Sequence, residues 1–137
     1  MQHILLHGDT GDAYDSSVAF ARRLAESFGA QLHIVYTVED PVGWVEEIRP
    51  EHLPEVHQAI EQEARDRLAS LIPTDAQERL HVNLVIRTGP AERELTRFTE
   101  EQHVDLAILQ APPGNEGSTD LAHALIDHGR CAVLVLR

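Results

Sequence analysis

An apolar helix passes directly into an apolar strand over residues 24–35, which read Leu24-Ala25-Glu26-Ser27-Phe28-Gly29-Ala30-Gln31-Leu32-His33-Ile34-Val35. Leu24 and Phe28 continue a helical spacing that begins at Val18, and Gly29 is the residue type that commonly ends a helix. The strand that follows is a nearly continuous apolar run, as expected when both faces of a parallel sheet are covered. This stretch therefore predicts an α/β fold.

The same alternation of strand and helix extends outward along the whole chain. Short apolar runs predict five strands over residues 3–8, 31–38, 81–87, 105–109 and 131–136. Amphipathic stretches predict four main helices over residues 15–28, 54–71, 91–102 and 119–128, with Pro73 closing the second and Ser118 or Thr119 capping the fourth. Strands alternating with helices favour right-handed crossovers and a parallel sheet. We expect one doubly wound, three-layer domain over residues 1–137.

Charge limits the classes of partner. The chain carries 11 basic and 23 acidic residues, a net charge of −12, so its surface repels nucleic acid and anionic lipid. Every basic residue is arginine. The absence of lysine excludes a P-loop lysine, Schiff-base chemistry and the lysine that a receiver domain needs.

Cysteine content and segment hydropathy limit the compartment. The single cysteine, Cys131, excludes an internal disulfide and zinc sites built on several thiolates. The segment beginning Met1-Gln2-His3 has no basic region before its apolar strand, and no apolar run reaches the roughly 20 residues that a membrane span needs. We expect a cytoplasmic protein without a signal peptide and without membrane association.

Five local patterns occur in a characteristic order. They are Ile4-Leu5-Leu6-His7-Gly8-Asp9, the helix-to-strand stretch quoted above, Gly89-Pro90-Ala91-Glu92, Val104-Asp105-Leu106-Ala107-Ile108-Leu109 and Cys131-Ala132-Val133-Leu134-Val135-Leu136-Arg137. Together they resemble the universal stress protein family from end to end. The resemblance implies a five-stranded parallel sheet of order 3-2-1-4-5. Its topological switch point then lies between strands 1 and 4, where such sheets bind ligands at their carboxyl ends.

The resemblance also implies an ATP site in that crevice. Many family members bind ATP through the signature Gly, two residues, Gly, nine residues, then Gly followed by Ser or Thr, which wraps phosphates onto a helix N-terminus. An aspartate after strand 1 holds the adenosine side, and Asp9 matches it. A valine that ends strand 2 meets adenine through its backbone, and Val38 matches it. Gly114, Gly117, Ser118 and Thr119 complete the expected nucleotide crevice.

The expected phosphate loop departs from the family signature. Nine residues after Gly117 the chain reads Asp127-His128, and aligning the fourth helix and fifth strand instead places Thr119-Asp120 at the Gly-Ser position. The family's usual glycine after strand 4 is replaced by Gln110, and the Pro112-Pro113 pair removes two N–H donors. Acidic Glu116 and Asp120 add repulsion toward phosphates. We therefore expect weak or no ATP binding and no resident cofactor, with an ATP- or AMP-binding sensor as the alternative.

Other clusters favour ordinary structural roles. The nine histidines show no metal-ligand spacing, so no metal site is expected. Asp9, Asp12 and Asp15 combine one ligand-facing aspartate with acids at a helix N-terminus. Cys131 is expected to be a small buried residue, and Trp44 is expected to close over a sheet edge or helix, with partner binding as the alternative. His7 lies beside the expected crevice.

The sequence contains no recognisable catalytic set. No acid–base pair or Gly-x-Ser-x-Gly nucleophile is found, so we expect no enzyme activity. The leading hypothesis is a stress-response homodimer that pairs through its Cys131–Leu136 edge strand and acts on a regulatory protein partner. The alternatives are a nucleotide sensor and a flavin-binding electron carrier.

Overall fold

The structure is a five-stranded parallel sheet of strand order β3-β2-β1-β4-β5, which confirms the predicted fold class. The computed structural model describes residues 1–8, 13–38, 53–110 and 116–136. The strands are β1 (His3–His7), β2 (Gln31–Val38), β3 (Asn83–Thr88), β4 (Leu106–Gln110) and β5 (Ala132–Leu136). The helices are α1 (Ala13–Phe28), α2 (Leu53–Leu71), α3 (Thr74–Arg79), α4 (Ala91–Glu101) and α5 (Glu116–His128).

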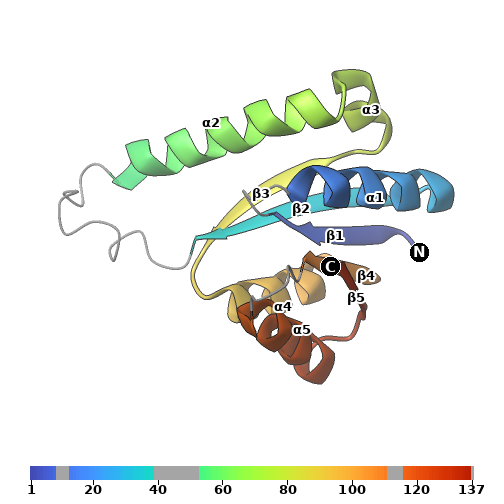
Figure 1. The fold of residues 1–137 in the computed structure, drawn as a ribbon, viewed down its shortest axis with the longest axis vertical. Helices are drawn as coiled ribbons and strands as arrows, with labels where there is room; N and C mark the ends of the chain where they lie inside the picture. The colour runs from blue at the N-terminus through green and yellow to red at the C-terminus, as the bar shows by residue number, and fades with distance from the viewer. Residues whose placement is uncertain (9–12, 39–52, 111–115, 137) are drawn as a thin grey trace.

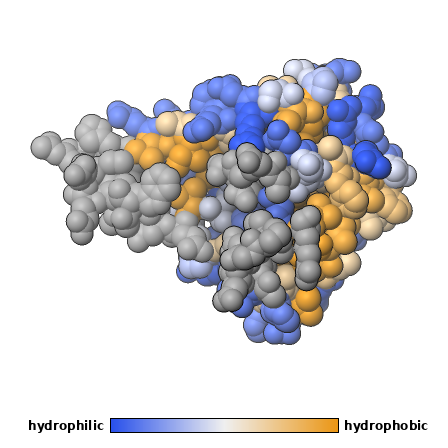
Figure 2. Space-filling view, in the orientation of Figure 1, coloured by the Kyte–Doolittle hydropathy of each residue, from blue (hydrophilic) through white to orange (hydrophobic). Residues whose placement is uncertain are grey.

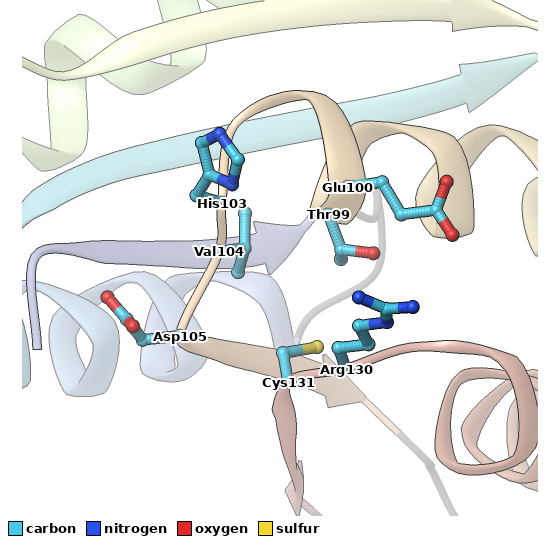
Figure 3. Close-up of a pocket in the computed structure, with 7 residues that line it drawn as sticks. All are labelled: Thr99, Glu100, His103, Val104, Asp105, Arg130 and Cys131. Carbon is cyan, nitrogen blue, oxygen red and sulfur yellow. The ribbon is translucent and has the colours of Figure 1, made fainter.

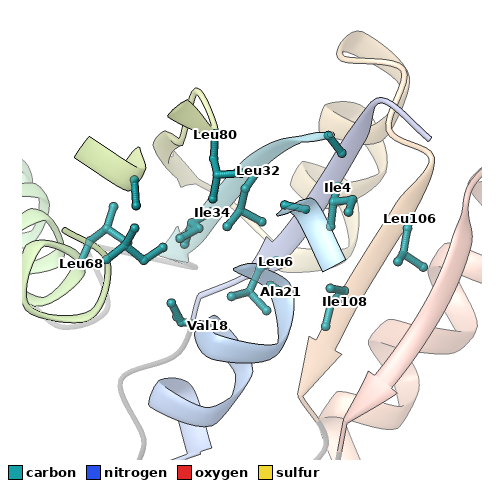
Figure 4. Packing of buried hydrophobic residues seen from close by; sticks show 14 of the residues in the cluster. Ile4, Leu6, Val18, Ala21, Leu32, Ile34, Leu68, Leu80, Leu106 and Ile108 are labelled. Atoms are coloured by element: carbon teal, nitrogen blue, oxygen red, sulfur yellow. The ribbon is translucent and has the colours of Figure 1, made fainter. Parts of the chain in front are cut away.

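The helices cover both faces of the sheet and make three layers (Figure 1). One apolar cluster joins α1, α2 and α3 to the sheet. Figure 4 labels ten of its members, including Val18, Leu68 and Ile108. A second cluster joins α4 and α5 to the opposite face through Phe98 and Leu125. The alternation of side chains along each strand sends successive residues to these two clusters.

β1 lies at the centre of the sheet, between β2 and β4. Its residues Ile4, Leu5 and Leu6 are all fully buried, Ile4 and Leu6 in the first cluster and Leu5 in the second. Burial on both faces explains why this strand reads as a continuous apolar run. The carboxyl ends of β1 and β4 therefore lie side by side, which places the predicted switch point in the structure.

Some predicted boundaries are wrong, and backbone geometry explains them. β3 was expected from His81, but it begins at Asn83 because His81 has a φ of 50°, a left-handed conformation that cannot continue a strand. The short helix α3 was not expected. α2 ends at Leu71, two residues before Pro73, as predicted, and Pro73 also occupies the N-cap position of α3.

The last helix begins earlier than predicted. α5 starts at Glu116 rather than Thr119, so Ser118 and Thr119 lie within its first turn and do not occupy the N-cap position. Gln110, which was placed in the loop after strand 4, is the last residue of β4. The loop between β4 and α5, which was expected over Gln110–Thr119, is therefore shorter at both ends.

β5 forms one edge of the sheet, as predicted. Apolar surface gathers on the side of the molecule where β5 lies (Figure 2). Val135 is 38% exposed, and Ala132 is exposed as well. The exposed residues of this edge are therefore apolar.

Candidate ligand crevice

The carboxyl ends of the strands carry polar side chains at the switch point. His7 ends β1, and its Nε2 lies 2.9 Å from Thr37 Oγ1 near the end of β2, so the two side chains share a hydrogen bond. Both residues lie on the sheet face that α4 and α5 cover, because Leu5 and Val35 of the same alternation belong to that cluster. His7 therefore lies at the carboxyl end of β1, the edge at which the sequence places the expected crevice.

Gln110 occupies the opposite face of the same edge. It follows Ile108 by two residues on β4 and therefore points to the face that α1 and α2 cover. The residue is only 8% exposed, and neither its Nε2 nor its Oε1 has a hydrogen-bond partner among the described residues. Buried amide groups without partners are costly and rare in folded proteins.

The ring of Tyr36 packs directly against the glycine at position 8, next to Gln110. Leu6 pairs with Ile108, so continuing this register places Gly8 beside Gln110. A Cβ at Gly8 would lie 2.7 Å from the ring of Tyr36, a steric clash. The aromatic ring of Tyr36 thus extends over the end of β1, toward the strand that carries Gln110.

Val38 lies on the β2–β3 side of the edge. Its carbonyl oxygen accepts a 2.9 Å hydrogen bond from the Gly89 N–H and retains a second lone pair. Next to it, Thr88 Oγ1 lies 2.7 Å from His57 Nε2, which joins the end of β3 to α2. Val38 is thus hydrogen-bonded to the residue that follows β3, and β3 is in turn joined to α2.

The nucleotide residues predicted from the sequence are only partly described. Val38 is at the carboxyl edge, and Gly117, Ser118 and Thr119 are in the first turn of α5, where backbone N–H groups lack helical partners. Asp9 and Gly114 lie outside the described residues, as do Asp12, Trp44 and the Pro112-Pro113 pair. The sequence did not identify the buried, unpartnered amide of Gln110, although the polar residue at the end of an apolar strand was a usable signal.

A separate cavity of about 520 Å³ opens at the amino ends of β4 and β5 (Figure 3). It is lined by Thr99, Glu100, His103, Val104, Asp105, Arg130 and Cys131. Cys131 is partly buried rather than fully buried as expected, and burial raises the pKa of its thiol, which disfavours the reactive thiolate. Among the described residues, no group of three or more His, Cys, Asp or Glu side chains could hold a metal ion.

A second polar cluster crosses the sheet beneath α4. His3 Nδ1 lies 3.0 Å from His33 Nε2, and His33 Nδ1 lies 3.1 Å from Asn83 Nδ2. The ring of His33 also meets the ring of Phe98 edge-on, with centroids 5.3 Å apart. Burial, with a smaller contribution from the charge of His3, lowers the pKa of His33 from 6.5 to about 4. His33 is therefore a neutral core residue at physiological pH.

The family of the chain follows from a comparison of its whole sequence with family models. The model of the universal stress protein family matches residues 1–137. The chain belongs to the universal stress protein family. No curated protein sequence is matched closely enough to add to this finding.

Solved structures of universal stress proteins share its fold. The universal stress protein UspA from Lactobacillus plantarum is 20% identical with a TM-score of 0.68, covering 99% of this chain and 97% of that one. A universal stress protein in complex with cAMP is 19% identical with a TM-score of 0.66, covering 99% and 96%. The protein from Archaeoglobus fulgidus in complex with dAMP is 13% identical with a TM-score of 0.59, covering 100% and 98%. At these identities the likeness concerns the fold alone.

Within the described ranges, no helix combines the length and the apolar character required to cross a bilayer.

Proposed function

We propose that this universal stress protein is a non-catalytic regulatory protein whose crevice holds the adenosine part of a nucleotide weakly. The observation that carries the proposal is the carboxyl edge itself. Val38 and the first turn of α5 lie at the carboxyl edge and carry backbone groups that could bind a nucleoside, whereas β4 ends in the bulky Gln110, with Pro112 and Pro113 shortly after it in the sequence. Two of the similar solved structures are complexes with cAMP and dAMP, which supports an adenine nucleotide as the ligand class.

Charge argues against tight triphosphate binding. A triphosphate brings up to about four negative charges to a protein of net charge −12, and backbone N–H groups must offset this repulsion locally. Pro112 and Pro113 supply no N–H donors, and Glu116 and Asp120 add negative charge. We expect a Kd for Mg-ATP above about 100 μM, which corresponds to roughly 5.5 kcal/mol of binding free energy or less.

Calorimetry at low salt with Mg-ATP and adenosine tests the binding site. Adenosine should bind at least as tightly as ATP. Low-micromolar ATP binding that is lost when Gly114 and Gly117 are changed to bulkier residues would instead favour the ATP or AMP sensor. Substantial ATPase activity that disappears in Asp9→Ala would refute the non-catalytic assignment.

We further propose that the protein acts as a homodimer, paired antiparallel through β5 about a two-fold axis. An uncovered apolar edge such as β5 invites pairing with another chain, and pairing with its own copy closes that edge. Val133→Pro or Val135→Pro removes a ladder N–H and should shift the protein to monomer in sedimentation velocity. Wild-type protein that sediments only as a monomer at micromolar concentration would contradict the proposal.

A cytoplasmic location and a regulatory protein partner complete the proposal. The acidic surface is unsuited to nucleic acid and anionic lipid, which leaves protein partners as the expected class. Fractionation of the native cell, followed by cross-linking of the β5-disrupted and wild-type proteins, tests both points. Recovery in a membrane fraction would contradict the location.

A further inference from the structure

The cavity at the amino ends of β4 and β5 lies at the opposite edge of the sheet from the crevice, and its lining carries both signs of charge. Its volume of about 520 Å³ is within the range of small-molecule sites in proteins. Glu100 lines it from the last turn of α4, Asp105 from the position before β4, and Arg130 from the segment between α5 and β5. Three parts of the chain thus bring one guanidinium and two carboxylates to a single cavity.

Arg130 has no ion pair within the described part of the chain. The arginines of α2 and α4, such as Arg65 and Arg93, each lie within 4 Å of a carboxylate oxygen. Arg130 does not pair even with Glu100, although both line the same cavity. A guanidinium binds a carboxylate through two parallel N–H···O bonds. Arg130 is therefore available for the carboxylate of a ligand.

The end of α4 favours an ammonium group beside that carboxylate. Thr99 is 5% exposed, and its Oγ1 donates to the Thr96 carbonyl oxygen at 2.7 Å, so toward the cavity this hydroxyl can only accept. Figure 3 shows Thr99, Glu100 and Arg130 together at one end of the cavity. α4 and α5 both end here, and helix C-termini carry partial negative charge, which favours a cation. A carboxylate and an ammonium side by side form the head group of an α-amino acid.

Asp105 places a second carboxylate at the other end of the cavity (Figure 3). Its Oδ2 accepts hydrogen bonds from the N–H groups of Gln2 and His3, at 2.7 and 3.0 Å, which fix the side chain and leave Oδ1 for a further donor. Val104 and the half-buried Cys131 lie between the two ends and offer apolar surface. The lining therefore suits a chain of methylene groups that ends in a second cation.

We propose that this cavity binds a basic α-amino acid such as arginine or lysine. Arg130 holds the α-carboxylate, and Glu100 with Thr99 holds the α-ammonium. Asp105 holds the cation at the end of the ligand's side chain. A ligand with one anionic and two cationic groups complements one guanidinium and two carboxylates, and its net positive charge is attracted by a protein of net charge −12. This inference is independent of the proposed function, which concerns the carboxyl edge of the sheet.

Calorimetry with arginine and two analogues tests the assignment of each end. Agmatine lacks the α-carboxylate, and citrulline has a neutral side chain. We expect wild-type protein to bind arginine about tenfold more tightly than either analogue. Arg130→Gln should bind arginine and agmatine within about twofold, because the carboxylate then has no partner. Arg23→Gln, which alters an exposed arginine of α1, is the matched control and should behave as wild type.

The single cysteine of the chain gives a second readout, which locates the ligand. Arginine bound between Asp105 and Arg130 covers Cys131, so it should slow alkylation of the native protein by iodoacetamide. At about ten times the Kd, roughly a tenth of the protein is unliganded, and the reaction should be about tenfold slower. Arginine binding that leaves the alkylation rate unchanged overturns the proposal, because the ligand then lies elsewhere. Equal affinity of the wild type for all three ligands, or no arginine binding at about 10 mM, overturns it as well.

Discussion

Acid should destabilise this protein through His33 well before its carboxylates are protonated. The pKa of His33 is about 4 in the folded protein, against an ordinary value of 6.5, because the imidazole is 1% exposed and lies beside His3. Between these two pH values the unfolded chain takes up a proton that the folded chain does not. The free energy of unfolding is therefore fully retained above about pH 6.5 and decreases as the pH falls toward 4.

The magnitude follows from the difference between the two pKa values. It corresponds to about 3 kcal/mol at most, of which about 2 kcal/mol is lost between pH 7.5 and pH 5. Hydrogen bonds also lower the pKa of Glu26, Glu101 and Asp105, but those carboxylates lose their contribution to stability only below their ordinary values near 4. Measurements that stop at pH 5 therefore isolate the histidine effect from the carboxylates.

Urea unfolding at pH 7.5, 6 and 5 checks this prediction. His33→Gln keeps a polar side chain of similar reach but removes the titrating group, so its free energy of unfolding should vary by about 2 kcal/mol less than that of the wild type across this range. His123→Gln, at an exposed position on α5, serves as the matched control and should keep the wild-type pH dependence. Equal pH dependence in wild type and His33→Gln would refute the reasoning.

Three further outcomes are expected. Gly89→Ala should lower the free energy of unfolding by about 1–3 kcal/mol in urea titrations, because Gly89 has a φ of 140°, a backbone conformation that L side chains rarely adopt. An unchanged urea midpoint would contradict this. Phe98→Ala should lower the free energy of unfolding by about 3–5 kcal/mol in the same assay, since Phe98 is 1% exposed and packs against His33 and the Arg87 guanidinium. A loss below about 1 kcal/mol would contradict this, because it would mean that neighbouring residues fill the cavity. Cys131 should react with Ellman's reagent more slowly in the native protein than in urea, because burial raises its pKa; equal rates would contradict that.

The sequence predicted those features that depend on repeating local patterns. Apolar runs located all five strands, most clearly β1, β2 and β4, which are largely buried. The family resemblance supplied the strand order. α3 was missed because its six residues contain one buried apolar residue, Ala76, and no helical periodicity. The later start of β3 depends on the positive φ of His81, which the pattern of residues does not predict.

The site was harder to predict than the fold. Contacts such as His7 with Thr37 and His3 with His33 join residues 30 positions apart, so they appear only when β1 and β2 are in register. Gln110 was recognised in the sequence as a departure from the family pattern, but its burial without a partner depends on the packing of the completed sheet. The spacing of residues along the chain predicts neither contacts between strands nor the burial of a side chain without a partner.

The central position of β1 sets an order of events during synthesis on the ribosome. β2 can pair with β1 soon after it emerges, but about 70 further residues must be made before β4 begins. At 5–20 residues per second, this takes roughly 3.5–14 s, during which one edge of β1 has no strand to pair with. The nascent chain therefore exposes an unpaired, strongly apolar strand edge for seconds, and chaperones that bind such segments have the greatest effect in this interval.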